Sequence, residues 1–196
     1  MAKIKTSKND TKKEVIIQQA ALLFKFKSYS AASMRELAVA LGVEAPSLYN
    51  HIGSKSELLQ AICFKVGNKF ASQIETIENS GGCVVDKIEA IIRFHIQMMM
   101  ENFDEVYVAN HEWKHLQEPF LTDFLAIRRS YEKSLTTLVE TGINQNEIRQ
   151  TNPYVAVLTI LSAVRGLEFW HRNKKNVSPQ VLEDDMVNHL INGFVN

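Results

Sequence analysis

The spacing of the apolar residues constrains this chain more than any other feature of its sequence. Apolar side chains recur every three or four residues along most of it, and almost nowhere do they alternate with period two. Such spacing places them on one face of an α-helix. Within segment 11–27 this face would carry Ile16, Ile17, Ala20, Leu23 and Phe24. Glycine and proline, which commonly end helices, number only eight and four. We therefore expect an all-α protein.

Helix-ending signals divide the chain into about nine predicted helices. These cover residues 11–27, 33–41, 45–51, 54–78, 84–101, 105–117, 119–142, 153–171 and 178–194. The lysine-rich segment before them is predicted to be disordered. We expect two domains, a small N-terminal one over residues 1–55 and a larger helical one over residues 56–196.

Composition excludes several classes of protein. The two cysteines, Cys63 and Cys83, have no paired spacing, which argues against a disulfide framework and against a structural zinc site. No apolar run approaches the length of a membrane span, and the N-terminus leads into no signal-peptide core. We expect a cytoplasmic protein with no membrane partner, no metal and no cofactor.

Charge is distributed unevenly although the formal net charge is zero. Residues 1–65 contain ten Lys or Arg against five Asp or Glu, whereas residues 66–196 contain twelve against seventeen. A basic end on an acidic remainder is typical of a protein whose one end faces a polyanion. This pattern indicates nucleic acid as a partner of the N-terminal part, although surface charge can also scatter in this way by chance.

The segment SMRELAVALGVEAPSLYNHIGSKSELL, residues 33–59, contains two short predicted helices joined by a tight turn. Ser33 and Glu36 have the spacing of a capping box, which opens a helix that ends before Gly42. Pro46 is tolerated in the first turn of the next helix, and Ser54 caps the following long one. These proportions are typical of a helix-turn-helix, although a hairpin of helices also suits any small bundle.

The stretch from Lys13 to Leu59 resembles the DNA-binding domain of the TetR family of bacterial regulators. The matching residues are Ala20, Phe24, Tyr29, Leu37, Ala38, Gly42, Val43, Leu48, Tyr49, His51, Ser54, Lys55, Leu58 and Leu59. Three residues depart from the family pattern. Ser28 stands where a glycine usually precedes the aromatic residue, Ile52 stands where phenylalanine is usual, and Glu44 stands where Ser or Thr is common.

The resemblance implies a DNA-reading role for the second helix of the pair. Ser47, Tyr49 and Lys55 would contact phosphates, and Glu44, at the start of the helix, would repel a nearby phosphate. In or beside the major groove would lie Arg35, Ala45, Pro46, Asn50 and His51. Two alternatives stay open, since Tyr49 could be a packing aromatic and His51 a cap of the helix C-terminus.

The remainder of the chain resembles the same family more loosely. Residues 110–135, NHEWKHLQEPFLTDFLAIRRSYEKSL, are similar to a subgroup that includes sterol-catabolism regulators sensing acyl-coenzyme A thioesters. The resemblance implies a homodimer formed through the last two helices. It also implies a repressor that a small apolar or acyl-CoA-like effector releases from a palindromic double-stranded DNA operator.

Candidate effector-binding residues lie in the five helices before the last one. They are Phe70, Phe94, Met98, Met99, Phe103, Trp113, Phe124, Tyr131, Val164, Arg165 and Phe169. Methionines and aromatics suit bulky apolar ligands, but each of these residues could equally be ordinary core. Arg165 could face an anionic group of the ligand or pair with Glu168 on the same helix.

Two other functions compete with this interpretation. His111, Glu112 and His115 form a literal H-E-x-x-H, which on a continuous helix could bind zinc with Glu112 as general base. No third metal ligand follows these residues at a recognisable spacing along the chain, although His95 could approach them in space. We therefore expect that the protein is not an enzyme. The second alternative is a helical scaffold protein that binds no DNA.

Overall fold

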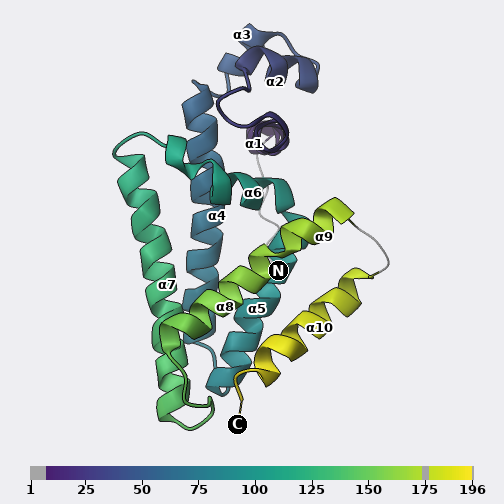
Figure 1. Ribbon diagram of the computed structural model, residues 1–196. Helices are drawn as coiled ribbons and strands as arrows, with labels where there is room; N and C mark the ends of the chain where they lie inside the picture. The colour runs from purple at the N-terminus through teal and green to yellow at the C-terminus, as the bar shows by residue number, and fades with distance from the viewer. Residues whose placement is uncertain (1–7, 174–176, 196) are drawn as a thin grey trace. The chain divides into compact units, whose positions relative to one another are not determined.

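The computed structural model describes residues 8–173 and 177–195, and its elements are helices (Figure 1). The long and medium helices are α1 (Lys8–Lys27), α4 (Lys55–Glu78), α5 (Val84–Glu101), α7 (Phe120–Asn144), α8 (Pro153–Arg165) and α10 (Pro179–Asn192). The short ones are α2 (Met34–Leu41), α3 (Ala45–Tyr49), α6 (Phe103–His111), α9 (Leu167–Asn173) and the 3₁₀ turn η1 (Trp113–His115). An isolated bridge between Ile148 and Val195 is the only β pairing in the described ranges. The all-α prediction is confirmed. The segment before residue 11 was predicted to be disordered, but residues 8–10 belong to α1, so that part of the prediction is wrong; residues 1–7 lie outside the described residues.

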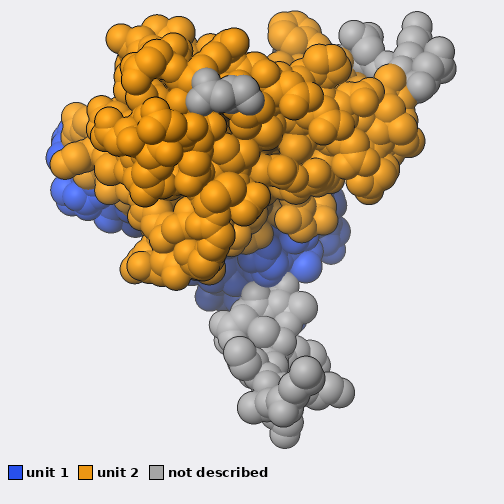
Figure 2. Space-filling view, turned by 90° about the horizontal axis from the view of Figure 1, so that it is seen from below, with its two compact units in different colours: residues 1–67, 104–124 blue, residues 68–103, 125–196 orange. Residues whose placement is uncertain are grey.

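The chain divides into two compact units (Figure 2). Unit 1 comprises residues 1–67 and 104–124, and unit 2 comprises residues 68–103 and 125–196. Helices α4 and α7 each contribute residues to both units. The division of the chain at residue 55 into two folding domains stays a prediction.

Unit 1 has a core of aliphatic side chains and one aromatic side chain from four helices. The predicted apolar face of α1 is buried, with Phe24 only 1% exposed. Opposite it lie the buried residues Leu37, Ala38, Leu48, Ile52, Leu58, Leu59 and Ile62. Because full burial of an aliphatic side chain contributes about 1.5–3 kcal/mol, this cluster is sufficient to hold the short helices α2 and α3 in place.

Unit 2 is built around α5. Ile88, Ile91, Ile92 and Ile96 recur at the helical spacing and are almost completely buried. Helices α8, α9 and α10 all pack against α5. None of the described helices is both long enough and apolar enough to span a membrane.

Two predicted helices are interrupted. The expected helix 105–117 is divided into α6, which ends at His111, and the 3₁₀ turn η1, after which the chain turns to extended geometry at Leu116. The expected helix 153–171 is divided into α8 and α9 at Gly166. A Cβ at Gly166 would lie only 3.0 Å from the carbonyl oxygen of Ala163, so the tight junction favours a glycine.

Candidate nucleic-acid interface and ligand groove

Helix α2 is closed at both ends by local hydrogen bonds. The amide of Glu36 donates to Ser33 Oγ at 3.2 Å, and the amide of Ser33 donates to Glu36 Oε2 at 2.9 Å. Hydrogen bonds from Lys27 and Ser33 lower the pKa of the Glu36 carboxyl. Gly42 has φ +66°, and the next amide, from Val43, donates to the carbonyl of Ala38 at 3.0 Å. The predicted capping box and glycine stop are confirmed.

Helix α3 is held from one side only. Leu48 and Ile52 are each 1% exposed, whereas Pro46, Ser47, Tyr49 and Asn50 are exposed. Tyr49 is 51% exposed, so its ring is not a core aromatic within this chain. The arrangement leaves a row of short polar side chains and one aromatic ring free to meet a partner.

The other predicted DNA-contacting residues border this row. Arg35 and Glu44 are exposed, and Ala45 and His51 are partly buried. Glu44 occupies the N-cap position of α3 but makes no side-chain capping hydrogen bond. Ser47 and His51 also line an open apolar groove of about 480 Å³ between α1 and the α2–α3 pair.

Lys55 has hydrogen-bond partners within the chain that were not predicted from the sequence. Its ammonium donates to the carbonyls of Tyr29 and Ala32, both at 2.9 Å, and lies 4.5 Å from the centre of the Tyr29 ring. The lysine therefore stabilises the turn between α1 and α2. Its predicted contact with a phosphate stays a proposal.

The turn that Lys55 stabilises contains Ser28 in the left-handed region, with φ +73°. Glycine adopts this conformation at little cost, whereas a residue with a Cβ does not. This explains in physical terms why glycine is usual at this position of the pattern that the chain resembles.

A group of charged residues joins α1, α4 and α6 within unit 1. Lys65 on α4 binds Glu105 of α6 at 2.8 Å and also binds Glu14 of α1. Lys25 of α1 pairs with Asp104, the second residue of α6. Burial alone would lower the pKa of Lys65, but its hydrogen bonds to Glu105 and Glu14 outweigh burial and raise it.

The H-E-x-x-H sequence does not form a helical metal site. Helix α6 ends at His111, so His111 and His115 do not share one face of a continuous helix. The ring of His111 lies against Tyr107, and that of His115 stacks on Tyr29 with centroids 5.3 Å apart. Glu112 is buried with Oε2 3.4 Å from His115 Nε2. No group of three or more metal-binding side chains occurs in the part of the chain that was described.

Unit 2 contains an aromatic cluster with a polar centre. Phe70 lies within 6 Å of Phe94, His95 and Tyr131, measured between ring centroids at 5.4, 4.5 and 5.8 Å. His95 Nε2 lies 2.7 Å from the hydroxyl of Tyr131. Burial, with the nearby positive charge of Arg165, lowers the pKa of His95 to about 3, and burial raises the pKa of Tyr131. His95 is therefore a neutral hydrogen-bonding group.

The predicted effector-binding residues are divided between the two units. Phe70, Phe94 and Tyr131 meet in the aromatic cluster, while Phe103 stacks on His171 with ring centroids 3.8 Å apart. Trp113 and Phe124 belong to unit 1, where Phe124 contacts Phe64. The others lie in unit 2: Met98, Met99 and Val164 are buried, and Arg165 and Phe169 are exposed.

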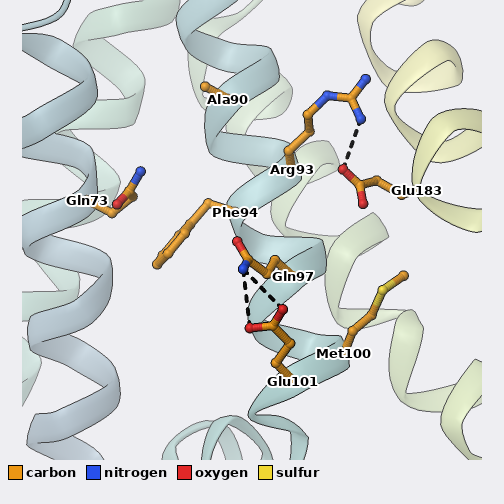
Figure 3. Close-up of a pocket in the computed structure, with 8 residues that line it drawn as sticks. All are labelled: Gln73, Ala90, Arg93, Phe94, Gln97, Met100, Glu101 and Glu183. Atoms are coloured by element: carbon orange, nitrogen blue, oxygen red, sulfur yellow. Dashed lines mark hydrogen bonds and ion pairs between the residues drawn. The ribbon is translucent and has the colours of Figure 1, made fainter. Parts of the chain in front are cut away.

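A groove of about 440 Å³ lies in unit 2 between α4, α5 and α10 (Figure 3). Its lining residues are Gln73, Ala90, Arg93, Phe94, Gln97, Met100, Glu101 and Glu183. Of these, the sequence pattern predicted only Phe94. Apart from Met100, the others are polar or small residues on helix surfaces, and their meeting depends on how α10 packs on α5.

Helices α8, α9 and α10 leave large apolar side chains exposed. These are Tyr154, Val155, Leu158, Phe169 and Val181, each at least 50% exposed. Exposed apolar side chains in such number on neighbouring helices mark an interaction surface.

Comparisons with known proteins agree with this architecture. Residues 16–62 match the family model described as bacterial regulatory proteins, tetR family, and residues 81–194 match the tetracyclin repressor-like C-terminal domain. A curated relative, the HTH-type transcriptional repressor KstR2 of Mycolicibacterium smegmatis, is 19% identical over 150 residues, which are 76% of this chain and 73% of the relative.

Two solved structures are similar over almost the whole chain. AibR in complex with isovaleryl coenzyme A and operator DNA is 25% identical with a TM-score of 0.80, covering 91% of this chain and 97% of its own. The ketosteroid transcriptional regulator KstR2 of Mycobacterium tuberculosis is 15% identical with a TM-score of 0.88, covering 99% and 97%. The second similarity concerns the fold alone.

Proposed function

The chain belongs to the TetR family of DNA-binding transcriptional regulators, which are not enzymes, and on that premise we propose that it is a homodimeric repressor released from a palindromic operator by a small ligand. Family membership removes the metalloprotease alternative. Binding to chromosomal DNA would give the protein a cytoplasmic location.

The observation that carries the DNA-binding proposal is the one-sided burial of α3. Leu48 and Ile52 anchor the helix, and its opposite face remains open to solvent. In this proposal Ser47, Tyr49 and Lys55 contact phosphates. The candidates for the major groove and its edges are Arg35, Glu44, Ala45, Pro46, Asn50 and His51. Because an exposed helix of this width fits the major groove of B-DNA, the surface can read base edges without refolding.

The dimer proposal is supported by the exposed apolar residues of α8, α9 and α10. A second copy of the chain would cover Tyr154, Leu158 and Val181, which water otherwise surrounds. A homodimer of this kind contains two copies of α3, one for each half-site of a palindrome. In such dimers the half-sites lie about 34 Å apart, one turn of the duplex.

One relative supports the ligand proposal, and another supports the assignment as a repressor. AibR was solved with isovaleryl coenzyme A and operator DNA, and KstR2 is named a repressor. By analogy, a small apolar or acyl-CoA-like effector would favour a conformer in which the two α3 helices no longer match successive major grooves. Release then requires only that the effector bind this conformer more tightly.

A selection experiment tests the proposal. The full-length protein should enrich a palindromic site from a random pool of duplex DNA, and its affinity for that site should fall steeply as salt rises. Asn50→Ala should relax the preference at one position of each half-site and cost about 1–3 kcal/mol. Lys133→Ala on the exposed surface of α7 is the matched control and should change neither. Failure to enrich any site would favour the scaffold alternative.

A further inference from the structure

The groove of unit 2 combines an aromatic floor with carboxylates that come from different helices. Phe94 extends from α5 toward the side of Gln73, and Met100 lies one to two turns further along α5 (Figure 3). Glu101 enters from the end of α5 and Glu183 from α10. The volume of about 440 Å³ is within the range of small-molecule sites.

The positive charge of the groove is already neutralised. Arg93 Nε lies 2.8 Å from Glu89, and its Nη1 lies 2.9 Å from Glu183 and 3.4 Å from Asp184. One guanidinium therefore faces three carboxylates. The hydrogen bonds that Arg93 donates, first to Glu89 and then to Glu183, raise the pKa of Arg93, so it stays a cation.

Glu101 adds a further negative charge. The amide of Gln97 donates to both of its oxygens at 3.2 Å, and within the described ranges no cation forms an ion pair with it. Lys69, one turn before Gln73 on α4, directs its ammonium to the side chain of Asn102 instead. The groove and its immediate rim thus carry two cations, Arg93 and Lys69, and four carboxylates, those of Glu89, Glu101, Glu183 and Asp184.

We propose that this groove binds a cationic amphiphile, an amine or quaternary ammonium carried on an apolar body. The carboxylates of Glu101 and Glu183 would attract the cation, and the ring of Phe94 would receive it by a cation–π contact. Anionic ligands, including coenzyme A thioesters, would be repelled here. The inference rests on the proposed function, because the groove's occupant is taken to be the effector, and it narrows that function: of the two effector classes proposed above, it selects the small apolar one, with a cationic head, over the acyl-CoA-like one.

Occupancy would also change how α10 is held. In the present structure Glu183 binds Arg93 and so ties α10 to α5. A ligand cation competes with Arg93 for this carboxylate. Binding in the groove is thereby coupled to α10, which carries part of the proposed dimer surface.

Calorimetric titration of the full-length protein with decyltrimethylammonium, decanol, decanoate and decanoyl coenzyme A, each below its micelle concentration, tests the proposal. The ammonium compound should bind about tenfold or more tightly than decanoate, since the two carry opposite charges toward the same carboxylates. Glu101→Gln should weaken binding of the ammonium severalfold while leaving decanol unaffected. Asp185→Asn on α10, outside the groove, is the matched control and should change nothing.

Two results would overturn the inference. One is decanoate or decanoyl coenzyme A binding as tightly as the ammonium compound. The other is ammonium binding that is equally tight in the wild type and in Glu101→Gln. This variant breaks no ion pair between described helices, so it should stay folded. Operator binding is measured on the same samples, and retained operator binding without ammonium binding contradicts the groove assignment but not the proposed function.

Discussion

Lys65 and Glu105 form an ion pair, 2.8 Å apart, that joins the middle of α4 to the first turn of α6. Glu105 is only 4% exposed, so its carboxylate depends on Lys65 for compensation. The same ammonium holds Glu14 of α1. Three helices of unit 1 therefore meet at one lysine, and α6 is fastened to the helices that support α2 and α3.

Lys65→Met should lower the free energy of unfolding by about 1–2 kcal/mol, because it leaves the carboxylate of Glu105 buried without a cation. The loss is smaller than for a fully buried pair, since the Lys65 side chain is still 23% exposed. Urea denaturation measures it. The double variant Lys65→Met with Glu105→Leu should regain much of the stability, and an equal loss in both variants would contradict the ion-pair account. Lys27→Met, which breaks the exposed pair with Glu36, is the control and should have little effect.

Because His95 is buried and neutral, we expect the stability of the folded protein to decrease in acid. Its pKa falls from 6.5 to about 3 on folding, so between these values the unfolded chain binds a proton that the folded chain does not. The contribution of neutral His95 to stability is therefore complete above pH 6.5 and decreases as the pH falls toward 3. At pH 5 the loss is about 2 kcal/mol.

Denaturation at a series of pH values checks this dependence on His95. His95→Gln can keep a hydrogen bond to Tyr131. Between pH 6.5 and 4.5 its free energy of unfolding should fall less steeply with decreasing pH than that of the wild type, by a slope that corresponds to about one bound proton. His189→Gln alters an exposed histidine of α10 and should leave the slope as it is. An unchanged slope in His95→Gln would mean that other groups cause the decline.

Ser28→Gly should stabilise the protein by about 0.5–1 kcal/mol, because glycine adopts φ +73° without the clash that a Cβ makes. The expected rise in Tm is about 1–4 °C. Ser30→Gly, in the same turn but outside the left-handed region, should lower Tm slightly because it only increases the entropy of the unfolded chain. Equal effects from the two variants would exclude strain at Ser28.

Tyr49→Ala and Lys55→Ala should differ in thermal unfolding although both weaken DNA binding. Tyr49 is half exposed and makes its proposed contact only with phosphate, so Tm should hold while affinity falls equally for all sequences. Lys55→Ala removes two hydrogen bonds to the carbonyls of Tyr29 and Ala32 and should lower Tm as well. Gel shifts and thermal melts on the same preparations separate the two roles.

Leu158→Asp should convert the proposed dimer into a folded monomer. Leu158 is 50% exposed within the chain, so a carboxylate there is tolerated by the monomer. In an apolar interface the same charge has no partner and costs several kcal/mol. Sedimentation measures the change, and Lys133→Ala on the exposed surface of α7 serves as the control. If the Leu158→Asp protein still sediments as a dimer, the dimer interface does not include this position of α8.

Local rules explain what the sequence predicted well. The capping box of Ser33 and Glu36, the glycine at position 42 and the cap at Ser54 depend on residues within four positions of one another, so short-range reasoning found them. The buried face of α1 follows from helical spacing in the same way.

Long-range geometry explains what the sequence did not reveal. The carbonyl partners of Lys55 lie more than twenty residues away along the chain, and the groove forms where α10 meets α5. The interruption at Glu112 involves no strong breaker residue at that position, and Gly166 alters the helix while keeping helical dihedral angles. Periodicity is insensitive to such features because it records only which side chains are apolar.

The one-sided anchoring of α3 bears on how such a regulator changes over time. Leu48 and Ile52 fix the helix, while Pro46, Ser47, Tyr49 and Asn50 make little contribution to the core. Under the proposed role of α3, duplicated copies of the gene can therefore diverge at the four exposed positions, with changes of affinity from Ser47 and Tyr49 and changes of base preference from Pro46 and Asn50, each intermediate remaining folded. A combinatorial library at these positions would explore the same routes, whereas one at positions 48 and 52 would yield mostly unfolded protein.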